Sequence, residues 1–258
     1  VFEYIRGHMD NSKLLDAEKG LLKPGCEVGD VPFMEGRNQI THSEEMLRVI
    51  ESPELFSIFE HIFGSGAVSM DYKWLRGVCR GAGTGAHVDS VYMSRGSKRT
   101  LTCWIPLGDT AIEMGTLTVC ETSHRADTFA KLRDTYGMLD IERDSVLGTG
   151  WFTQEAKDLT QFGANTLWRT SDFKAGDVLI FGLKTVHMST KNTTNKLRLS
   201  VDVRFQPADD TKDERYFGLD VDPSRRQKSG LQAINDQNKE CKEKRGVSMS
   251  ELRRDWKL

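Results

Sequence analysis

Residues 196–206 alternate strictly between apolar and polar side chains, which is the pattern of a β-strand with two different faces. One face carries Leu199, Val201, Val203 and Phe205, and the other carries Arg198, Ser200, Asp202 and Arg204. An α-helix repeats every 3.6 residues and therefore cannot separate these two sets. The segment predicts one long strand, and the alternation fixes which side chains it presents to each side.

Four earlier segments also have strand character, and each is bounded by Gly, Pro or Asp: residues 71–80, 99–107, 116–121 and 177–181. Few long helices separate them, so residues 69–206 predict a mainly β core, a sandwich or barrel of the jelly-roll kind. Before this core, Thr41 and Glu44 have the spacing of a capping box, and Ser52-Pro53 is typical of a second helix start. We expect these two helices to buttress the sheet.

The length of 258 residues fits one domain, here residues 1–258. Residues 128–171 form a long mixed segment, which we interpret as an insertion over the mouth of the barrel. Residues 207–258 are charged and rich in turns, and we interpret them as a C-terminal extension. The extension ends in a predicted helix, because Ser248 and Glu251 again have capping-box spacing.

Composition limits the partners and the location. The net charge is −2, which gives no overall attraction for nucleic acid, and no apolar run is long enough to cross a bilayer. Five scattered cysteines without a C-x-x-C pair predict reduced thiols rather than a zinc ribbon. We expect an intracellular, cytoplasmic protein that acts on a small molecule, with neither a nucleic acid nor a membrane as partner. The oligomeric state stays open, and a first residue that is Val1 suggests a start within a longer chain.

Two histidines and one aspartate have the setting of metal ligands. His87 and Asp89 are two residues apart, so on an extended backbone they point to the same face, and they follow the glycine-rich run 81–85. His187 follows the apolar strand 177–181 and its short extension. Two imidazoles and a carboxylate form the facial triad of non-haem Fe(II), which leaves positions for a co-substrate and O₂. A His-x-Asp pair alone also fits an ordinary surface pair.

Arg198 strengthens the metal interpretation. It begins the polar face of the alternating strand, eleven residues after His187, and Ser200 follows on the same face. A dicarboxylate that chelates iron at one end needs a cation at the other, and a guanidinium meets a carboxylate with two parallel hydrogen bonds. The alternative is that Arg198 pairs with a surface acid.

Several blocks, in order, resemble the phytanoyl-CoA dioxygenase family: residues 87–89, 102–107, 114–117, 122–125, 174–181 and 187–189, followed by Asn192 and Arg198. The resemblance covers roughly residues 69–206. It implies a double-stranded β-helix, a cupin-like jelly-roll barrel, and a dioxygenase that couples decarboxylation of 2-oxoglutarate to hydroxylation of an organic substrate. It implies His87, Asp89 and His187 as catalytic iron ligands.

The resemblance also implies that Arg198 and Ser189 contact the far carboxylate of 2-oxoglutarate and that Trp104 lines its pocket. If Trp104 faces the pocket, Thr102 shares that face, and its hydroxyl could reach the co-substrate. Contacts from Thr102 and Ser200 are left open. Asn192 is expected to hold its loop and His124 to be structural. Because halogenating relatives replace the carboxylate of Asp89, its presence predicts hydroxylation or a related oxidation.

Two other functions compete. Residues 81–86 fit the dinucleotide fingerprint G-x-G-x-x-A, but that motif needs a helix immediately afterwards, and a strand is predicted instead. A catalytically silent jelly-roll that binds a metal or ligand is the remaining alternative. The substrate stays open among acyl-CoAs, amino acids, osmolytes and natural products. Arg95, Lys98 and Arg99 are candidates for binding a phosphate group, but we expect them to face solvent.

Overall fold

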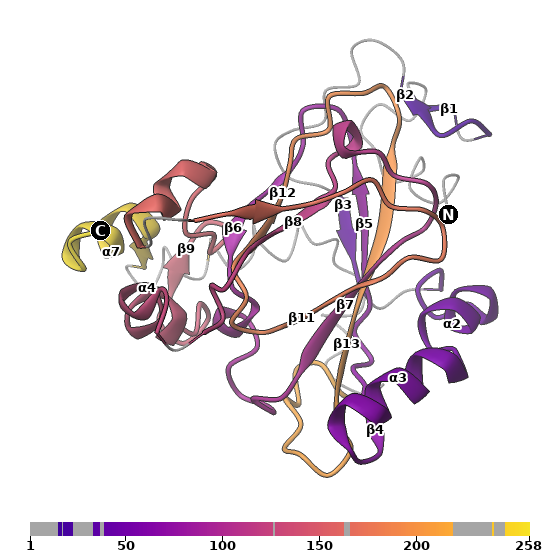
Figure 1. Cartoon of the computed structure of the whole chain (residues 1–258), viewed down its shortest axis with the longest axis horizontal. Helices are drawn as coiled ribbons and strands as arrows, with labels where there is room; N and C mark the ends of the chain where they lie inside the picture. The colour runs from indigo at the N-terminus through magenta and orange to yellow at the C-terminus, as the bar shows by residue number, and fades with distance from the viewer. Residues whose placement is uncertain are drawn as a thin grey trace.

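The computed structural model describes residues 15–16, 18–22, 33–36, 39–125, 127–162, 166–218, 239 and 246–258. Two antiparallel sheets form the centre of the molecule, with helices α2 and α3 on one side and α4 and α7 on the opposite side (Figure 1). The larger sheet has the order β11 (Leu179–Gly182), β7 (Leu101–Pro106), β13 (Arg198–Pro207), β5 (Trp74–Val78) and β3 (Phe33–Glu35), with β4 (Ala67–Ser69) also pairing with β13. The smaller sheet has the order β10 (Trp168–Arg169), β8 (Leu117–Cys120), β12 (His187–Ser189) and β6 (Thr84–His87).

Strand β13 is the alternating segment predicted from the sequence, and it lies at the centre of the larger sheet. Asp202 is paired with Trp104 on β7 and with Trp74 on β5. Its apolar residues join the core under α3, where the rings of Phe205 and Phe59 stack with centroids 4.0 Å apart. All ten residues of β13 are buried, so the polar face is turned into the protein rather than toward solvent. The two predicted faces are confirmed.

Helices α2 (Glu44–Ile50) and α3 (Pro53–Phe63) buttress the larger sheet. The start of α3 is as predicted: the Ser52 hydroxyl accepts a hydrogen bond from the Leu55 amide. The predicted cap of α2 is wrong, because Ser43 is the N-cap and accepts from the Met46 amide. Thr41 lies too early in the chain to reach that turn, and its hydroxyl donates to the Gly36 carbonyl instead.

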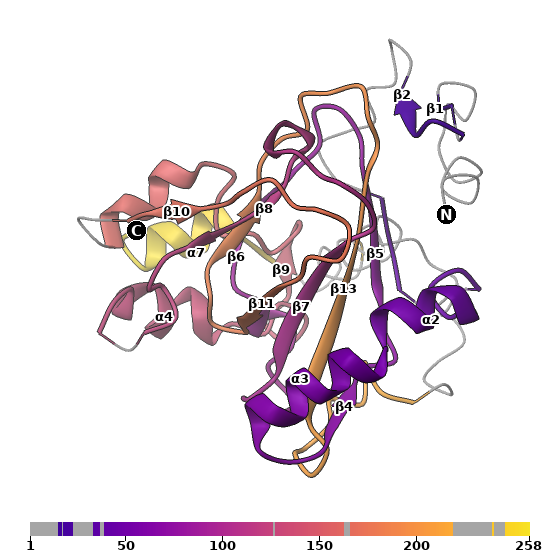
Figure 2. The same cartoon turned by 45° about the vertical axis from the view of Figure 1, so that its right-hand side comes forward.

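The predicted insertion contains short elements: α4 (Ala130–Asp134), β9 (Val146–Leu147), β10 and 3₁₀ turns at Tyr136–Met138 and Ala156–Phe162. Helix α7 (Met249–Asp255) lies beside them in Figure 2, and β14 (Val247–Ser248) pairs in parallel with β9. The capping box of Ser248 and Glu251 is confirmed. These elements share one apolar core with the smaller sheet, including Ala86, Val88, Cys120, Tyr136, Phe152 and Val186.

The remaining elements are β1 (Leu15–Asp16) paired with β2 (Leu21–Leu22) and 3₁₀ turns at Asp89–Val91 and Ile112–Met114. The fold is therefore mainly β, as predicted, with two antiparallel sheets whose hydrogen bonds do not close into a barrel within the described ranges. That one domain spans residues 1–258, and that residues 128–171 cover its mouth, stay predictions.

One strand assignment needs correction. His187 does not extend β11, since it begins β12 in the other sheet, after a turn in which the Thr185 amide donates to the Gly182 carbonyl. Of the helices that the structure describes, none is long and apolar enough to cross a membrane. Cys103 and Cys120 are buried and free, as expected, and Cys79 is buried as well, while Cys26 and Cys241 lie outside the described residues.

Candidate active site

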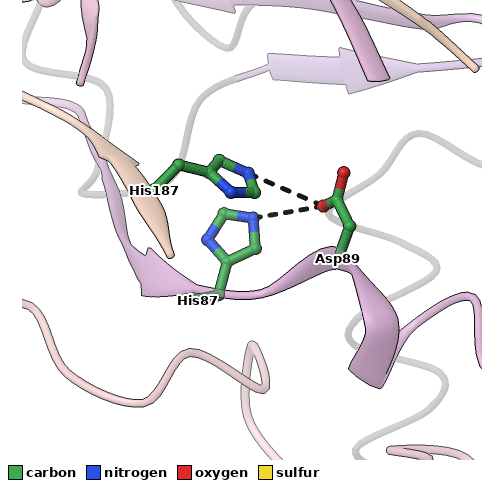
Figure 3. Close-up of side chains that lie close together, drawn as sticks. All are labelled: His87, Asp89 and His187. Carbon is green, nitrogen blue, oxygen red and sulfur yellow. Dashed lines mark ion pairs between the residues drawn. The ribbon is translucent and has the colours of Figure 1, made fainter. Parts of the chain in front are cut away.

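His87, Asp89 and His187 meet at the junction of β6 and β12. His87 ends β6, His187 begins β12, and the two are register partners across the smaller sheet. Asp89 begins the 3₁₀ turn that follows β6. The Nε2 atoms of both histidines lie 3.6 Å from Oδ1 of Asp89, and all three residues are buried (Figure 3). Metal–ligand bonds of about 2.1 Å place neighbouring donor atoms about 3–3.6 Å apart, so this spacing fits one ion.

Hydrogen bonds orient both imidazoles with Nε2 toward Asp89. Nδ1 of His87 bonds to the Gly85 carbonyl at 2.8 Å, and Nδ1 of His187 bonds to the Thr185 carbonyl at 2.9 Å. Because a carbonyl only accepts, Nδ1 carries a proton in each ring, which leaves Nε2 as the nitrogen that can bind a metal. Burial, followed by repulsion from His87, lowers the pKa of His187 to about 4, so this ring is a neutral ligand at neutral pH.

The two oxygens of Asp89 have separate partners. Oδ2 accepts a hydrogen bond from the Thr102 hydroxyl at 2.7 Å and another from Nη2 of Arg204 at 3.2 Å. Oδ1 is therefore the oxygen that faces the imidazoles. Burial alone would raise the pKa of Asp89, but Arg204 and the two histidines outweigh it and hold that pKa well below its usual value. The carboxylate is ionised and held in one orientation.

Arg198 is a buried cation without a counterion among the described residues. Its Nη1 donates to the Ser200 hydroxyl at 2.7 Å, its guanidinium lies 5.7 Å from the Trp104 ring, and its Nε has no hydrogen-bond partner. Burial, followed by repulsion from Arg76, lowers its pKa to about 9, although Asp202 opposes this shift. A ligand carboxylate would satisfy both the orphaned donor and the charge.

A small cavity of about 10 Å³ is lined by this arginine and by the two histidines of the triad. Its lining includes His87, His187, Trp104, Ser189 and Arg198. The donor set suits Fe(II) on one side, and the unpaired guanidinium suits the far carboxylate of a dicarboxylate on the other. The structure thus brings together the predicted ligands, Arg198, Ser200, Ser189 and Trp104, while their contacts with a co-substrate stay predictions.

The other residues singled out from the sequence have hydrogen bonds within the protein or lie outside the metal-ligand cluster. The Ser189 hydroxyl accepts from the Thr84 amide, and Thr102 bonds to Asp89, as described above. Asn192 donates to the carbonyls of Val78 and Lys196, which confirms its role in the loop. His124 is not part of the cluster of possible metal ligands found in the described ranges.

The sequence interpretation missed Arg204. It shares the polar face of β13 with Arg198, six residues apart, so alternation placed it on the correct side but gave no sign of its contact with Asp89. Arg95 and Arg99, considered as phosphate ligands, pair instead with Asp140 and Asp210.

The dinucleotide alternative is wrong. After residues 81–86 the chain completes β6 and enters a single 3₁₀ turn, so residues 87–100, all of which the structure describes, contain no helix that could receive a pyrophosphate. The glycines permit close packing: a Cβ added to Gly85 would lie 2.7 Å from the Thr153 carbonyl oxygen.

The two sheets, the buried triad and the buried Arg198 define a class of protein, the jelly-roll oxygenases that depend on non-haem iron and 2-oxoglutarate. The family model described as Phytanoyl-CoA dioxygenase (PhyH) matches residues 28–200. The chain belongs to the phytanoyl-CoA dioxygenase family and is an enzyme of this oxygenase class.

Solved structures of similar fold include two enzymes of nogalamycin biosynthesis. The non-heme alpha ketoglutarate dependent epimerase SnoN is 20% identical, with a TM-score of 0.54 over 77% of this chain and 74% of that chain. The carbocyclase SnoK is 20% identical, with a TM-score of 0.53 over 79% and 74%. EctD from S. alaskensis, solved with 2-oxoglutarate and 5-hydroxyectoine, is 16% identical, with a TM-score of 0.53 over 87% and 74%. A search by sequence found no significant match among curated proteins.

Proposed function

We propose that this chain hydroxylates, or otherwise oxidises, a small organic substrate with O₂ and 2-oxoglutarate, and that succinate and CO₂ are released. Fe(II) held by His87, Asp89 and His187 would supply the site where O₂ is activated beside the co-substrate. The observation that supports this most directly is the convergence of three buried donor atoms, within 4.8 Å of one another, next to an arginine that has no counterion in the part of the chain that the structure describes.

The protein's own groups prepare this site. The backbone carbonyls of Gly85 and Thr185 fix the imidazole rings with Nε2 inward. Thr102 and Arg204 occupy Oδ2 of Asp89, so the carboxylate offers the metal one oxygen rather than two. Ligation through a single oxygen would leave positions on a bound Fe(II) for the co-substrate and O₂.

Arg198 and its neighbours would bind the co-substrate. The guanidinium pairs with the far carboxylate, and Ser200, already bonded to Arg198, orients it. Trp104 and Ser189 line the same cavity, and apolar side chains on its wall, Leu117 and Phe181, exclude water. Because Asp89 occupies the position that halogenating relatives leave open, the expected outcome is oxidation without halogen transfer.

We also propose that residues 1–258 form one oxygenase domain and that the protein is intracellular. The first proposal is supported by the larger sheet, which contains strands from Phe33 to Pro207, and by α7, which packs on the core of the smaller sheet. The second is supported by the scattered, buried thiols.

Anaerobic titration with Fe(II) and 2-oxoglutarate tests the assignment of residues. The complete site should give a weak visible charge-transfer band, which His87→Ala abolishes. Arg198→Gln should weaken 2-oxoglutarate binding about 10- to 100-fold while iron still binds, because a charge-assisted pair is worth roughly 1.5–3 kcal/mol. Arg48→Gln, at an exposed arginine on α2, is the matched control.

Succinate release in air, screened over acyl-CoAs, amino acids and other small metabolites, tests catalysis. At least one compound should stimulate release above the background without substrate. A protein that binds iron and 2-oxoglutarate normally but releases no succinate with or without any candidate would be the silent binding protein instead.

A further inference from the structure

A second and much larger cleft lies beside the triad. It has a volume of about 1420 Å³ and is lined by the turn after β6, the end of β8, strand β11 with the turn after it, and residues between 137 and 143. Ser90, which directly follows Asp89, lines it, and the Ser90 amide donates to the Leu183 carbonyl at 3.0 Å. The cleft wall is therefore formed by the segments that carry the metal ligands.

Phe181 is the wall shared by this cleft and the inner cavity. It lines both, and its ring centroid lies 4.5 Å from that of His187. A molecule in the cleft that touches Phe181 is thus one side chain away from the triad. This is the position that an organic substrate of the proposed reaction must take.

Most of the cleft wall is apolar. Its hydrophobic lining includes Met93, Leu101, Met138, Leu139, Leu179 and Leu183. Met138 is 69% exposed and adds accessible apolar surface to this wall.

The charged groups of the cleft leave a positive excess. Arg95 is paired with Asp140 at 2.6 Å. Arg143 is paired with Asp144, and Glu121 with Arg169, so each of these is compensated. Lys98 and Lys184 also line the cleft, are exposed, and form no ion pair with any carboxylate that the structure describes.

We infer that this cleft binds the substrate of the proposed reaction, and that the substrate is a largely apolar molecule bearing an anionic group, a carboxylate or a phosphate. The anion lies at Lys98 or Lys184, and the apolar body extends along β11 toward Phe181. Pockets for drug-sized ligands span about 300–1,000 Å³, so a free amino acid or a compact osmolyte would leave most of this cleft unfilled. That the bound molecule is the substrate rests on the proposed function, whereas the preference of the cleft for apolar anions does not.

Displacement of the fluorescent probe 8-anilinonaphthalene-1-sulfonate from the metal-free protein tests the preference. The competitors have the same chain and different heads: dodecanoate, dodecyl phosphate, dodecanol and dodecylammonium, all below their micelle concentrations. Both anions should displace the probe at lower concentration than the alcohol, and the cation should be weakest. Comparison of the two anions distinguishes a carboxylate from a phosphate ligand. Equal displacement by all four heads overturns the inference.

Two sets of variants locate the binding. The double variant Lys98→Gln, Lys184→Gln should reduce the preference for anions about three- to tenfold, as expected for the loss of two solvent-exposed charges. Lys191→Gln, at an exposed lysine outside the cleft, is the control and should leave this preference unchanged. Met138→Asp should weaken all four competitors, whereas Ile112→Asp, at another exposed apolar residue, should not. If these variants bind the competitors as the parent protein does, the binding site is not this cleft.

This assay separates the two proposals. Failure of Fe(II) and 2-oxoglutarate to bind, with normal displacement by anions, would remove the proposed function and leave the binding cleft. Normal binding of Fe(II) and 2-oxoglutarate, without displacement by anions, would remove the inference alone. If the proposed function and the binding cleft are both correct, the bound anions should stimulate succinate release more than the alcohol does.

Discussion

Asp89 is the residue on which the site's geometry depends most. Its Oδ1 faces the two imidazoles of the smaller sheet, and its Oδ2 is held by Thr102 and Arg204 of the larger sheet. Without those two donors the carboxylate could rotate or offer both oxygens to a metal. The side chains behind a ligand therefore determine how many coordination positions stay free.

Thr102→Val should lower the affinity for Fe(II) about 10- to 100-fold, because it removes one of the two hydrogen bonds that orient Asp89 while it keeps the side-chain shape. Anaerobic titration of Fe(II) measures the change. Thr118→Val is the matched control, since that hydroxyl donates to the Arg169 carbonyl on the neighbouring strand. Equal iron affinity in the two variants would contradict a positioning role for Thr102.

At this scale the sequence predicted the metal ligands but not the residues behind them. His87, Asp89 and His187 are chemically distinctive types in a recognisable order. Arg198 and Arg204 are the same type on the same face of one strand, and only the packing of the two sheets brings Arg204 to Asp89. The sequence placed Thr102 on the correct face of its strand, but the expected partner of its hydroxyl was the co-substrate rather than Asp89.

Strand β6 depends on close packing at Gly85. A Cβ on this residue would lie 2.7 Å from the Thr153 carbonyl oxygen and 2.8 Å from the Trp151 ring. The Gly85 carbonyl also accepts the hydrogen bond that orients His87. The same residue thus serves the packing of the sheet on the segment after β9 and the geometry of the metal site.

Gly85→Ala should destabilise the protein by about 1–3 kcal/mol, the usual cost of overpacking, and should also weaken iron binding. Urea denaturation and iron titration measure the two effects. Gly108→Ala is the control, because a Cβ there would meet nothing within 4 Å. Similar stability of the two variants would mean that the strand accommodates the methyl group without strain.

The loop at residues 140–144 is held by Asp140, a buried carboxylate beside the larger cleft. It accepts hydrogen bonds from the Arg95 guanidinium, the Ser94 hydroxyl and the Arg143 amide. Burial alone would raise the pKa of Asp140, but these donors outweigh it and lower that pKa below its usual value. A lowered carboxyl pKa contributes stability above the unfolded-state pKa of about 3.9, and this stability is lost as the pH falls further.

Asp140→Asn should therefore reduce the free energy of unfolding by about 1–3 kcal/mol at pH 7, because the charge-assisted bonds are lost. The difference from the parent protein should shrink as the pH falls below about 4, because Asp140 of the unfolded chain is then protonated while the folded carboxylate is still ionised. Urea denaturation at several pH values measures both quantities. A difference that stays constant across this range would show that the charge of Asp140 contributes nothing.

Five of the strands that the structure describes could be predicted from the sequence, but their division between sheets could not. Two-residue alternation and turn residues locate β5, β7, β8, β11 and β13 to within a few residues. His187 was attached to the preceding strand because residues 182–186 carry no strong break. A strand of three residues, such as β12, is defined by its hydrogen bonds to β6 and β8, which local pattern does not reveal.

In the molecule as a whole, the proposed metal centre connects the two sheets. The imidazoles belong to β6 and β12, while the groups that hold Asp89 belong to β7 and β13. Since the hydrogen bonds of the two described sheets do not close a barrel, contacts through Asp89 are one of the links across the interior. Metal binding at this point should stabilise the fold and not only the site.

A metal that binds the folded chain alone stabilises it by RT ln(1 + [M]/Kd), about 2.7 kcal/mol at 100 times Kd. For a chain of this size the melting temperature should rise by about 5–10 °C. Mn(II), which prefers similar ligands and does not oxidise readily, allows the measurement in air by calorimetry, and a chelator should reverse the shift. His87→Ala should show no shift at the same Mn(II) concentration. If this variant is stabilised as much as the parent protein, the ion binds elsewhere, and the triad does not link the sheets through a metal.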